Sequence, residues 1–516
     1  MEAASLPRRR GRSASEALVE AVRSRSRAFW ILAGLTVLGA ALRFATLGLQ
    51  SYHHDEVVTA SRVLRVGFGH AMDAVGFSES APPLYYALAW VWTQVTGTGE
   101  WGLRSLSALA GVLTIPVAYL LGRELRSRRT GLVAAALVAV NPMLLWYSQE
   151  GRAYALLTLL CALSLLYCVR ALSGRGGRGE KRDLYAWGIF SALALATHYF
   201  AAFPIAVEGV LLLRRHGRAC FRGLAIVGLV ALLLVPLAIH QMSYDHAEWI
   251  GKFSLGHRVW ESAATFFTGE TGDIIGGPEH PSLAYLPLAL ALASFGLLAR
   301  RGDRDEKRAT AVPLAVAAVT IGIPLALAIA SSSNDYFLAR NLLPALLPLL
   351  LVVAIGSTLR RARRLGAVLA AALFAYSLAF CVWVQFDEEL QRPDWHRVAE
   401  RLGEPQAPRA TVLWTLGEAP LRFYLSTGAI QLHASEGFDW LVREIAFVSD
   451  GPVPPPPARL LGSGFREIAH EDLGRLFLRR YRLDAPGLAP LPLREVRKAS
   501  LHWRTNGVLL DGVGPQ

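Results

Sequence analysis

Three consecutive ionisable residues, His54, Asp55 and Glu56, follow the first long apolar segment of the chain. Carboxylates at the boundary of a bilayer are costly to desolvate, and proteins usually place them there for chemistry. Such a group can accept a proton from a reacting hydroxyl. The alternative is a solvated loop in which ordinary acids stand beside aromatic anchors. These three residues are therefore the first place to look for a general base.

Further polar residues stand at the ends of other apolar segments, where they could share a site with this triplet. They are Glu79 and Tyr85, then Glu150, Arg152 and Tyr154 in the sequence SQEGRAY, then the pair His198 and Tyr199, and finally Arg340 at the end of SSSNDYFLAR. Their convergence from separate segments favours a common functional site.

Several of these residues also have a structural interpretation. Glu150 and Arg152 either pair with each other to lower the cost of charge near the bilayer, or Arg152 holds an anionic or hydroxyl-rich ligand. His198 is typical of a satisfied histidine at a helix end, and Tyr199 of an aromatic belt. Arg340 either snorkels to the interface or binds a phosphate group together with the free N–H groups of a helix start.

The chain as a whole is too apolar for a soluble protein of its size. Of its 516 residues 53% are hydrophobic, and its apolar runs are long enough to span a bilayer. The net charge is +13, but the arginines gather between apolar runs, as they do in the cytoplasmic loops of membrane proteins. We therefore reject a nucleic-acid partner and predict a multi-pass protein of the plasma (inner) membrane. The four cysteines lie in apolar runs without metal-ligand spacing, so no zinc site is predicted.

Eleven apolar ranges are candidates for membrane spans. They are 29–49, 101–122, 130–147, 153–172, 184–199, 200–213, 222–240, 283–299, 310–330, 341–358 and 365–385. The range 82–97 is apolar but short. The positive-inside rule assigns it to the outer interface as a juxtamembrane helix, with Tyr85, Tyr86, Trp90 and Trp92 at headgroup level. All arginine clusters then fall inside, and the candidate site residues fall on the extracytoplasmic side.

Two more arginines, Arg43 within the first span and Arg104 at the start of the second, are further candidates for contact with a lipid phosphate. After position 386 the apolar runs shorten to strand length, as at Ile445 to Val448, and alternate with helix-like pieces such as Trp395 to Leu402. The fold class is therefore mainly α, a bundle of about eleven transmembrane helices with a small C-terminal α/β domain. Its expected parts are a basic cytoplasmic N-terminal arm at 1–28, a membrane domain at 29–386 and an extracytoplasmic domain at 387–516.

In their order and common side, these residues resemble the GT-C superfamily of polyprenyl-phosphate-sugar glycosyltransferases, in the family 39-like branch of protein O-mannosyltransferases and aminoarabinose transferases. The matching features are the Asp55-Glu56 pair, PPLYY at 82–86, Arg104 with the following span, SQEGRAY, His198-Tyr199, and Arg340 followed by Leu342 to Pro344. The likeness covers about the first 350 residues. It implies a GT-C-type catalytic domain and an inverting transferase with Asp55 as the catalytic base and Glu56 beside it. Ala81 stands where aminoarabinose transferases carry a lysine thought to touch the donor phosphate, so that contact falls to Arg340 or Arg152.

The resemblance implies a polyprenyl-phosphate-linked sugar as donor, drawn from the membrane lipid, and a glycan, lipid or protein as acceptor. Asp55 would take the proton of the acceptor hydroxyl while Arg340 neutralises the phosphate, and we expect both to border one cavity with Arg152. Four alternatives stay open. Glu79 could be the second carboxylate of a retaining enzyme, and Asp55 and Glu56 could hold a divalent cation. The protein could also transport polyprenyl-linked lipid or polysaccharide without chemistry, or it could be a structural membrane protein whose tail recruits partners.

Overall fold

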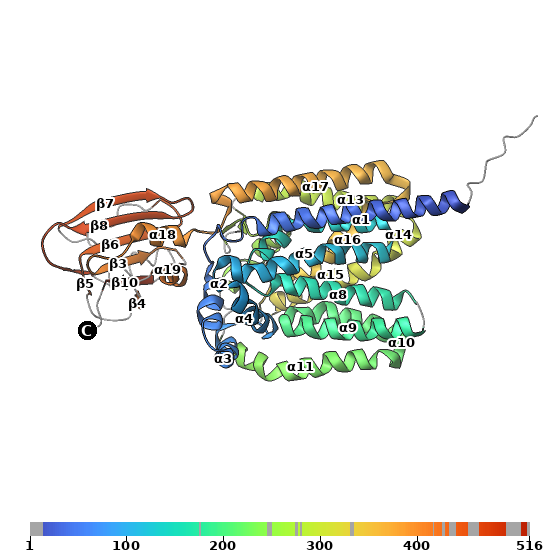
Figure 1. Ribbon diagram of the computed structural model, residues 1–516, viewed down its shortest axis with the longest axis horizontal. Helices are drawn as coiled ribbons and strands as arrows, with labels where there is room; N and C mark the ends of the chain where they lie inside the picture. The colour runs from blue at the N-terminus through green and yellow to red at the C-terminus, as the bar shows by residue number, and fades with distance from the viewer. Residues whose placement is uncertain are drawn as a thin grey trace, which may run out of the picture.

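The protein is a bundle of long helices with a sheet-containing domain at one end, as seen in a computed structural model (Figure 1). The structure describes residues 14–174, 177–244, 250–273, 277–278, 281–330, 335–415, 417–425, 429–432, 440–452, 464–491 and 507–512. The first 13 residues of the predicted N-terminal arm lie outside these ranges.

Each predicted apolar range coincides with a helix or, in one case, with a bent pair of helices. They are α1 (Ala14–Phe44), α5 (Glu100–Leu125), the pair α6 (Arg128–Val140) and α7 (Pro142–Ser148), α8 (Tyr154–Leu172), α9 (Gly177–Thr197), α10 (Ala202–His216), α11 (Phe221–Met242), α13 (Tyr285–Arg301), α15 (Ala311–Ala330), α16 (Leu343–Gly356) and α17 (Arg363–Phe386). Among the described residues, seven helical runs are long and apolar enough to cross a membrane, or eight if the bent pair is one span, and one run, Tyr199–Met242, includes both α10 and α11. The multi-pass membrane protein is confirmed, whereas the number of eleven spans stays a prediction.

Helices α6 and α7 meet at an angle of 57°, at Asn141 and Pro142. Proline suits the first turn of a helix because its missing N–H would have no helical partner there, and the Asn141 side chain accepts a backbone N–H of the same turn. The wholly buried Arg43 donates to the carbonyl oxygens of Val138 and Ala139 at 3.2 and 2.9 Å, which the end of α6 leaves without helical donors. Arg43 therefore holds the bend and does not face a lipid phosphate.

The loop after α1 folds into short helices. They are α2 (His54–Val58), the π-helical turn η1 (Thr59–Leu64), α3 (Phe68–Ser78) and α4 (Leu84–Thr96). Helix α4 coincides with the predicted juxtamembrane range, but Tyr85 and Tyr86 are not at its outer face. Both are wholly buried, because their hydroxyls find internal partners in Ser107 at 3.1 Å and Glu79 at 2.9 Å.

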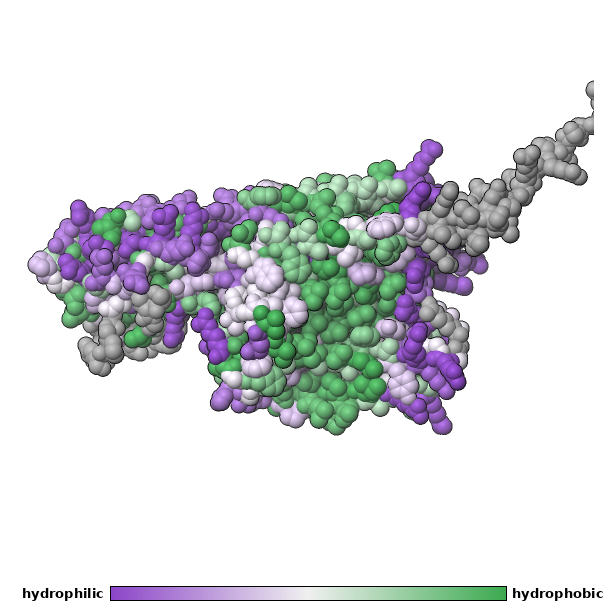
Figure 2. Space-filling view, viewed as in Figure 1, coloured by the Kyte–Doolittle hydropathy of each residue, from purple (hydrophilic) through white to green (hydrophobic). Residues whose placement is uncertain are grey.

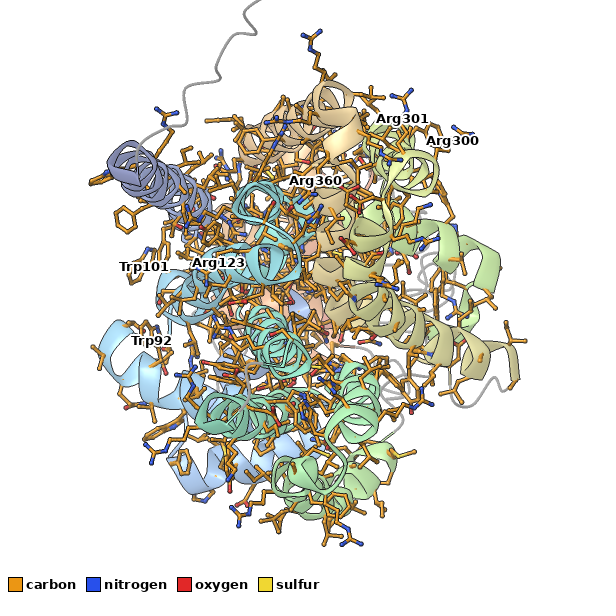
Figure 3. All side chains as sticks on the ribbon, turned by 90° about the vertical axis from the view of Figure 1, so that its right-hand side faces the viewer. Trp92, Trp101, Arg123, Arg300, Arg301 and Arg360 are labelled. Atoms are coloured by element: carbon orange, nitrogen blue, oxygen red, sulfur yellow. The ribbon has the colours of Figure 1, made fainter. Side chains whose placement is uncertain are left out.

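The arginine-rich loops at 123–129, 214–218, 300–308 and 360–364 lie at the end of the bundle opposite α2, α3 and α4 (Figure 1). Arg126 lies 3.5 Å from Glu306 of α14 (Arg304–Ala309), and Arg129 donates to the Arg363 carbonyl at 3.5 Å, so three of the loops touch. Figure 3 looks onto this end, where the labelled residues include Arg123 at the end of α5, Arg300 and Arg301 at the end of α13, and Arg360 in the turn after α16. An apolar band separates it from the end that carries the C-terminal domain (Figure 2).

The C-terminal domain has a mixed sheet with strand order β4-β10-β3-β6-β8-β7, in which β3 and β6 are parallel and the other pairs antiparallel. The strands are β3 (Arg409–Leu413), β4 (Ile430–Leu432), β6 (Glu444–Ser449), β7 (Phe465–Asp472), β8 (Phe477–Leu483) and β10 (Gly507–Asp511), with β5 (Trp440–Val442) and β9 (Ala489–Leu491) in a separate pair. Helices α18 (Trp395–Leu402) and α19 (Glu418–Tyr424) pack on one face of the sheet through a shared apolar core. The predicted helix-like piece at 395–402 is α18.

Candidate active site

Asp55 and Glu56 stand side by side in α2 but face different surroundings, because neighbouring residues of a helix point in different directions. The Asp55 side chain keeps 28% of its surface exposed, whereas that of Glu56 is wholly buried. The Glu56 carboxylate accepts the backbone N–H of His53 at 3.0 Å and closes a capping box at the start of α2. This cap fixes the direction in which Asp55 points.

Glu56 is an anchor of the site. Its carboxylate accepts two hydrogen bonds from the Arg104 guanidinium at 2.8 and 2.7 Å, and one from the Gly151 N–H at 2.7 Å. Burial raises the pKa of Glu56, but the Arg104 guanidinium outweighs burial and holds it at about 2. Arg104 also donates to backbone carbonyl groups of the chain just before α2. The pair therefore ties α2 to α5 and to the SQEGRAY turn, and Arg104 is committed to these partners.

Asp55 is the exposed acid of the site. Its carboxylate lies 3.0 Å from the guanidinium of Arg340, which belongs to the 3-10 turn η6 (Ala339–Leu342) at the start of α16. Arg152 donates to the Asp55 carbonyl at 3.3 Å. Burial raises the pKa of Asp55, but Arg340 and Arg152 outweigh burial and hold it well below its usual range. The structure thus brings Asp55, Arg152 and Arg340 into contact, while a cavity bordered by all three stays a prediction.

Arg152 pairs with Glu79 across the site, at 2.6 Å. Glu79 also accepts hydrogen bonds from Thr59 at 3.1 Å and Tyr86 at 2.9 Å, and Thr59 accepts one from Arg152 at 2.9 Å. The alternative that Glu150 pairs with Arg152 is wrong. The Arg152 N–H bonds to the Glu150 carbonyl at 2.8 Å in a tight turn, and the two side chains reach different partners.

Glu150 pairs with a residue that the sequence did not indicate. Its carboxylate lies 3.0 Å from Arg392, whose guanidinium also stands 4.4 Å above the ring centre of Trp146. Burial raises the pKa of Glu150 to about 7, although Arg392 lowers it. Arg392 belongs to the chain after α17, where no known motif was found. One signal could have marked it, because an arginine just outside the last span runs against the positive-inside rule.

Aromatic rings line the site beside Arg152. The Tyr154 ring centre lies 4.7 Å from that of Tyr147 and 5.6 Å from that of His198. Tyr199 turns elsewhere, because its hydroxyl donates to Gln241 of α11 at 2.8 Å.

Glu270 is a second residue that the sequence did not indicate. It follows α12 (Leu255–Thr268), and its carboxylate accepts a hydrogen bond from the Tyr147 hydroxyl. Burial raises the pKa of Glu270, although Arg340 and Tyr147 lower it. A buried ion pair between Arg258 of α12 and Asp335, at 2.5 Å, holds the chain shortly before Arg340. Helix α12 thus supports this side of the site.

His54 and Tyr85 occupy less central places. The Nδ1 atom of His54 is buried and has no hydrogen-bond partner within the part of the chain that the structure describes. The Tyr85 hydroxyl is engaged with Ser107. Neither side chain forms an ion pair or a hydrogen bond with Asp55 among the described contacts.

The donor set does not fit a divalent cation held by Asp55 and Glu56 together. Both oxygens of Glu56 are occupied by N–H donors of Arg104, Gly151 and His53. Within the described ranges, no group of three or more His, Cys, Asp or Glu residues could hold a metal ion. We therefore derive no step through a metal.

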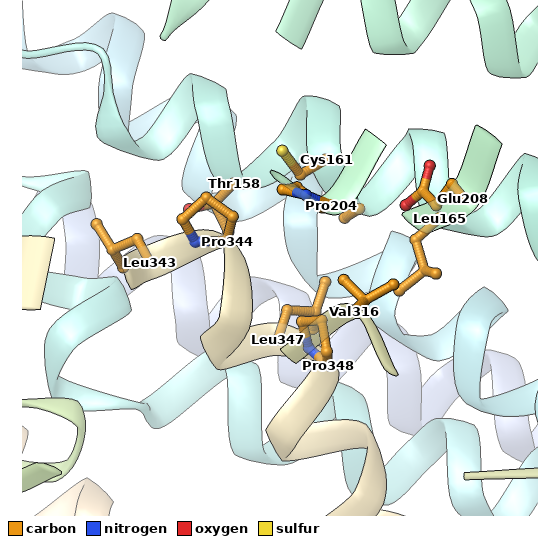
Figure 4. A pocket seen from close by; sticks show the side chains of 11 residues that line it. Thr158, Cys161, Leu165, Pro204, Glu208, Val316, Leu343, Pro344, Leu347 and Pro348 are labelled. Atoms are coloured by element: carbon orange, nitrogen blue, oxygen red, sulfur yellow. The ribbon is translucent and has the colours of Figure 1, made fainter. Parts of the chain in front are cut away.

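An apolar pocket lies next to the site, between α8, α10, α15 and α16 (Figure 4). Its α16 wall begins at Leu343 and Pro344, a few residues after Arg340. At the opposite end stands Glu208, whose carboxylate accepts hydrogen bonds from the Ser164 hydroxyl and, at 2.8 Å, from the Trp187 indole. The remaining lining residues are Thr158, Cys161, Ala162, Leu165, Pro204, Val316, Leu347 and Pro348.

The arrangement of the chain is similar to that of a solved structure. The crystal structure of ArnT from Cupriavidus metallidurans bound to undecaprenyl phosphate superimposes with a TM-score of 0.51, at 16% sequence identity, over 86% of this chain and 97% of that one. The chain therefore has the GT-C fold, as the sequence resemblance predicted.

Sequence comparisons find similarity to proteins that are described as glycosyltransferases. The family model described as dolichyl-phosphate-mannose-protein mannosyltransferase matches residues 80–240. The chain is 30% identical to the undecaprenyl phosphate-alpha-4-amino-4-deoxy-L-arabinose arabinosyl transferase of Pseudomonas aeruginosa (strain LESB58) over 284 residues. The matched residues are 53% of this chain and 48% of that protein. The protein of the same description from Pseudomonas paraeruginosa (strain DSM 24068 / PA7) is 29% identical over 53% of this chain and 49% of its own length. The chain spans about half the length of the curated relatives that it matches.

Proposed function

We propose that this protein is a membrane glycosyltransferase that moves a sugar from a polyprenyl-phosphate-linked donor to an acceptor hydroxyl, with inversion and with Asp55 as the general base. The observation that carries the proposal is the partly exposed Asp55 carboxylate, held ionised beside Arg340 and Arg152 at the end of the helical bundle. An ionised acid can accept a proton, and a guanidinium beside it can bind the phosphate that leaves.

Arg340 acts on both the base, Asp55, and the phosphate of the donor. In the structure its guanidinium neutralises Asp55 at 3.0 Å, which makes the carboxylate a weak base. A donor phosphate attracts the same guanidinium through charge-assisted hydrogen bonds. Donor binding would therefore draw Arg340 away from Asp55 and raise the basicity of the carboxylate when it is needed. As the bond between the anomeric carbon and the phosphate oxygen breaks, Arg340 stabilises the charge that develops there.

The proposed reaction needs one base. The acceptor oxygen attacks the anomeric carbon from the side opposite the phosphate, and its proton passes to Asp55. A retaining mechanism needs a second carboxylate free to act as a nucleophile. Glu79 is buried and engaged by Arg152, Thr59 and Tyr86, which supports inversion.

The membrane supplies the donor. Apolar faces of α8, α10 and α16 meet a few residues after Arg340, at Leu343 and Pro344. A polyprenyl chain whose phosphate lies at the guanidinium would meet apolar helix surfaces there, although the pocket between these helices is too small to hold the chain in this structure. Relatives that match part of this chain are named for an undecaprenyl phosphate donor. By the positive-inside rule, the arginine-rich end of the bundle faces the cytoplasm, so the site and the C-terminal domain lie on the extracytoplasmic side of the inner membrane. The acceptor is a hydroxyl of a glycan, lipid or protein.

The substitution Asp55→Asn tests the base. We expect transfer of a radiolabelled sugar from its polyprenyl phosphate carrier to fall by at least about 100-fold, because the amide cannot take the acceptor proton. The matched control is Asp73→Asn, which makes the same change at an exposed position of α3. Retained transfer in the Asp55 variant would remove the assignment. Lipid movement without any sugar transfer in the unaltered protein would favour the transporter instead.

A further inference from the structure

The segment that carries Asp55, residues 52–65, has too little regular secondary structure to keep its shape by itself. We call it the catalytic loop. Its helix α2 has only five residues, and a helix of that length is not stable by itself. The loop must therefore be held by its neighbours, and the structure shows which neighbours these are.

Tyr424, the last residue of α19, holds the beginning of the loop. Its hydroxyl oxygen accepts the backbone N–H of Tyr52 at 2.6 Å and donates to the carboxylate of Glu100 at 2.5 Å. Glu100 is the first residue of the long helix α5. One hydroxyl of the C-terminal domain thus bridges the start of the catalytic loop to a rigid helix of the bundle.

Phe423, the neighbouring residue, contacts both ends of the loop. Its ring packs edge-to-face against that of Tyr52, with 5.6 Å between the ring centres. The guanidinium of Arg65, at the other end of the loop, lies 4.3 Å from the centre of the same ring. Such a contact is attractive because the face of the ring carries partial negative charge.

These two side chains are fixed within their own domain. Leu421 and Leu425, on either side of the pair, belong to the apolar core that α18 and α19 share with the sheet. A second connection lies close by, where the Ser51 hydroxyl donates to the Pro393 carbonyl and accepts the Trp395 N–H, each at 2.9 Å. The position of the catalytic loop therefore depends on the C-terminal domain as well as on the pair of Glu56 with Arg104.

We propose that Phe423 and Tyr424 are positioning residues, through which the C-terminal domain holds the catalytic loop so that Asp55 faces the acceptor. This role rests on the proposed function for its effect on catalysis, but not for its effect on the loop. Neither residue lies in the first 350 residues, which carry the sequence resemblance to the glycosyltransferases. The domain contributes no acid or base to the reaction by this route.

Two measurements on the purified full-length protein test the proposal, with the variants Tyr424→Phe and Phe423→Ala. The first is hydrogen exchange in peptides that cover residues 52–65, which we expect to be about 10-fold faster in both variants because one hydrogen bond or one ring contact is lost. The second is the kinetics of sugar transfer. We expect kcat to fall about 10-fold with KM for the donor unchanged, because Arg340 is anchored outside the loop.

Tyr481→Phe is the matched control. It removes a tyrosine hydroxyl that donates to Glu467 at 2.9 Å within the sheet, away from the loop, and should leave both measurements unchanged. Unchanged exchange in β3 and β6 shows that the variant domains are still folded. Loop exchange equal to that of the unaltered protein would overturn the proposal, and so would faster loop exchange with full kcat. If the unaltered protein transfers no sugar, the proposed function fails, while the exchange experiment still reports on the loop.

Discussion

Asp55 and Glu56 show how two identical charges one position apart can serve different purposes. Glu56 is buried against Arg104 and has no surface left for a substrate. Asp55 is partly exposed and meets Arg340, whose guanidinium can exchange partners. The buried pair gives the position, and the exposed pair gives the chemistry.

The pH dependence of transfer should report on Arg340. In the unaltered protein the pKa of Asp55 is held well below its usual range, so Asp55 stays ionised and kcat/KM holds up as the pH falls. In Arg340→Gln the main cause of the lowering is removed, and the acid limb of kcat/KM should move to higher pH. Rates measured between about pH 4 and pH 8 would show the shift, since model carboxylates titrate near 4.

The control is Arg466→Gln, at an exposed arginine that pairs with Asp484 on the C-terminal sheet. Its pH profile should match that of the unaltered protein. An Arg340→Gln profile with the same acid limb would mean that Asp55 is not the group that must be ionised.

The residues of the site were predictable to different degrees. Asp55, Arg152 and Arg340 stand at the ends of apolar segments, where charge is costly, so their types and places already indicated a shared site. Glu270 comes from a loop where charge is ordinary and carries no such signal, and Arg392 was marked only by its place just outside the last span, where the positive-inside rule disfavours arginine. The partners of Glu150 and Arg152 could not be predicted either, because they depend on how the turn directs two side chains that are near in sequence.

At the scale of elements, the helices were the predictable part. Long apolar ranges gave nearly the helices of the structure because a bilayer leaves the chain few other ways to satisfy its backbone. The 57° bend between α6 and α7 was not predicted, although Pro142 marks it. The inward turn of Tyr85 and Tyr86 was missed because hydroxyl partners on other elements cannot be read from the sequence of α4.

The contact between α5 and α7 depends on the absence of a side chain at Gly111. A methyl group there would overlap with the Ser148 hydroxyl and lie 2.9 Å from Nε of Arg43, which bonds to that hydroxyl at 3.1 Å. Gly111→Ala should therefore destabilise the protein by about 1–3 kcal/mol. Thermal unfolding in detergent would show a lower midpoint.

Gly34→Ala is the control for this change. It lies on an exposed part of α1 with nothing within 4 Å of an added methyl group, so the better helix propensity of alanine should leave the midpoint equal or slightly higher. Equal midpoints in both variants would mean that the packing around Arg43 is not tight.

At the scale of the whole molecule, an apolar band (Figure 2) separates the arginine-rich end from the end where α2 carries Asp55 (Figure 1). The proposed orientation can be tested by cysteine labelling, because all four native cysteines are buried. Asp73 on α3 and Arg361 at the other end of the bundle are both exposed. In intact cells a membrane-impermeant maleimide should label Asp73→Cys but not Arg361→Cys. Arg361→Cys should react only after the cells are permeabilised. The reverse pattern would turn the site towards the cytoplasm and contradict the proposal.

The pairing of Asp55 with Arg340 also sets an order of events. While no lipid carrier is present, the Asp55 carboxylate is paired with Arg340, so an alcohol that enters the site binds to it only weakly. Once a carrier has taken the guanidinium, the same alcohol finds a competent partner for its proton. In the proposed mechanism the carrier therefore arrives first and the alcohol second, an order that needs no moving lid.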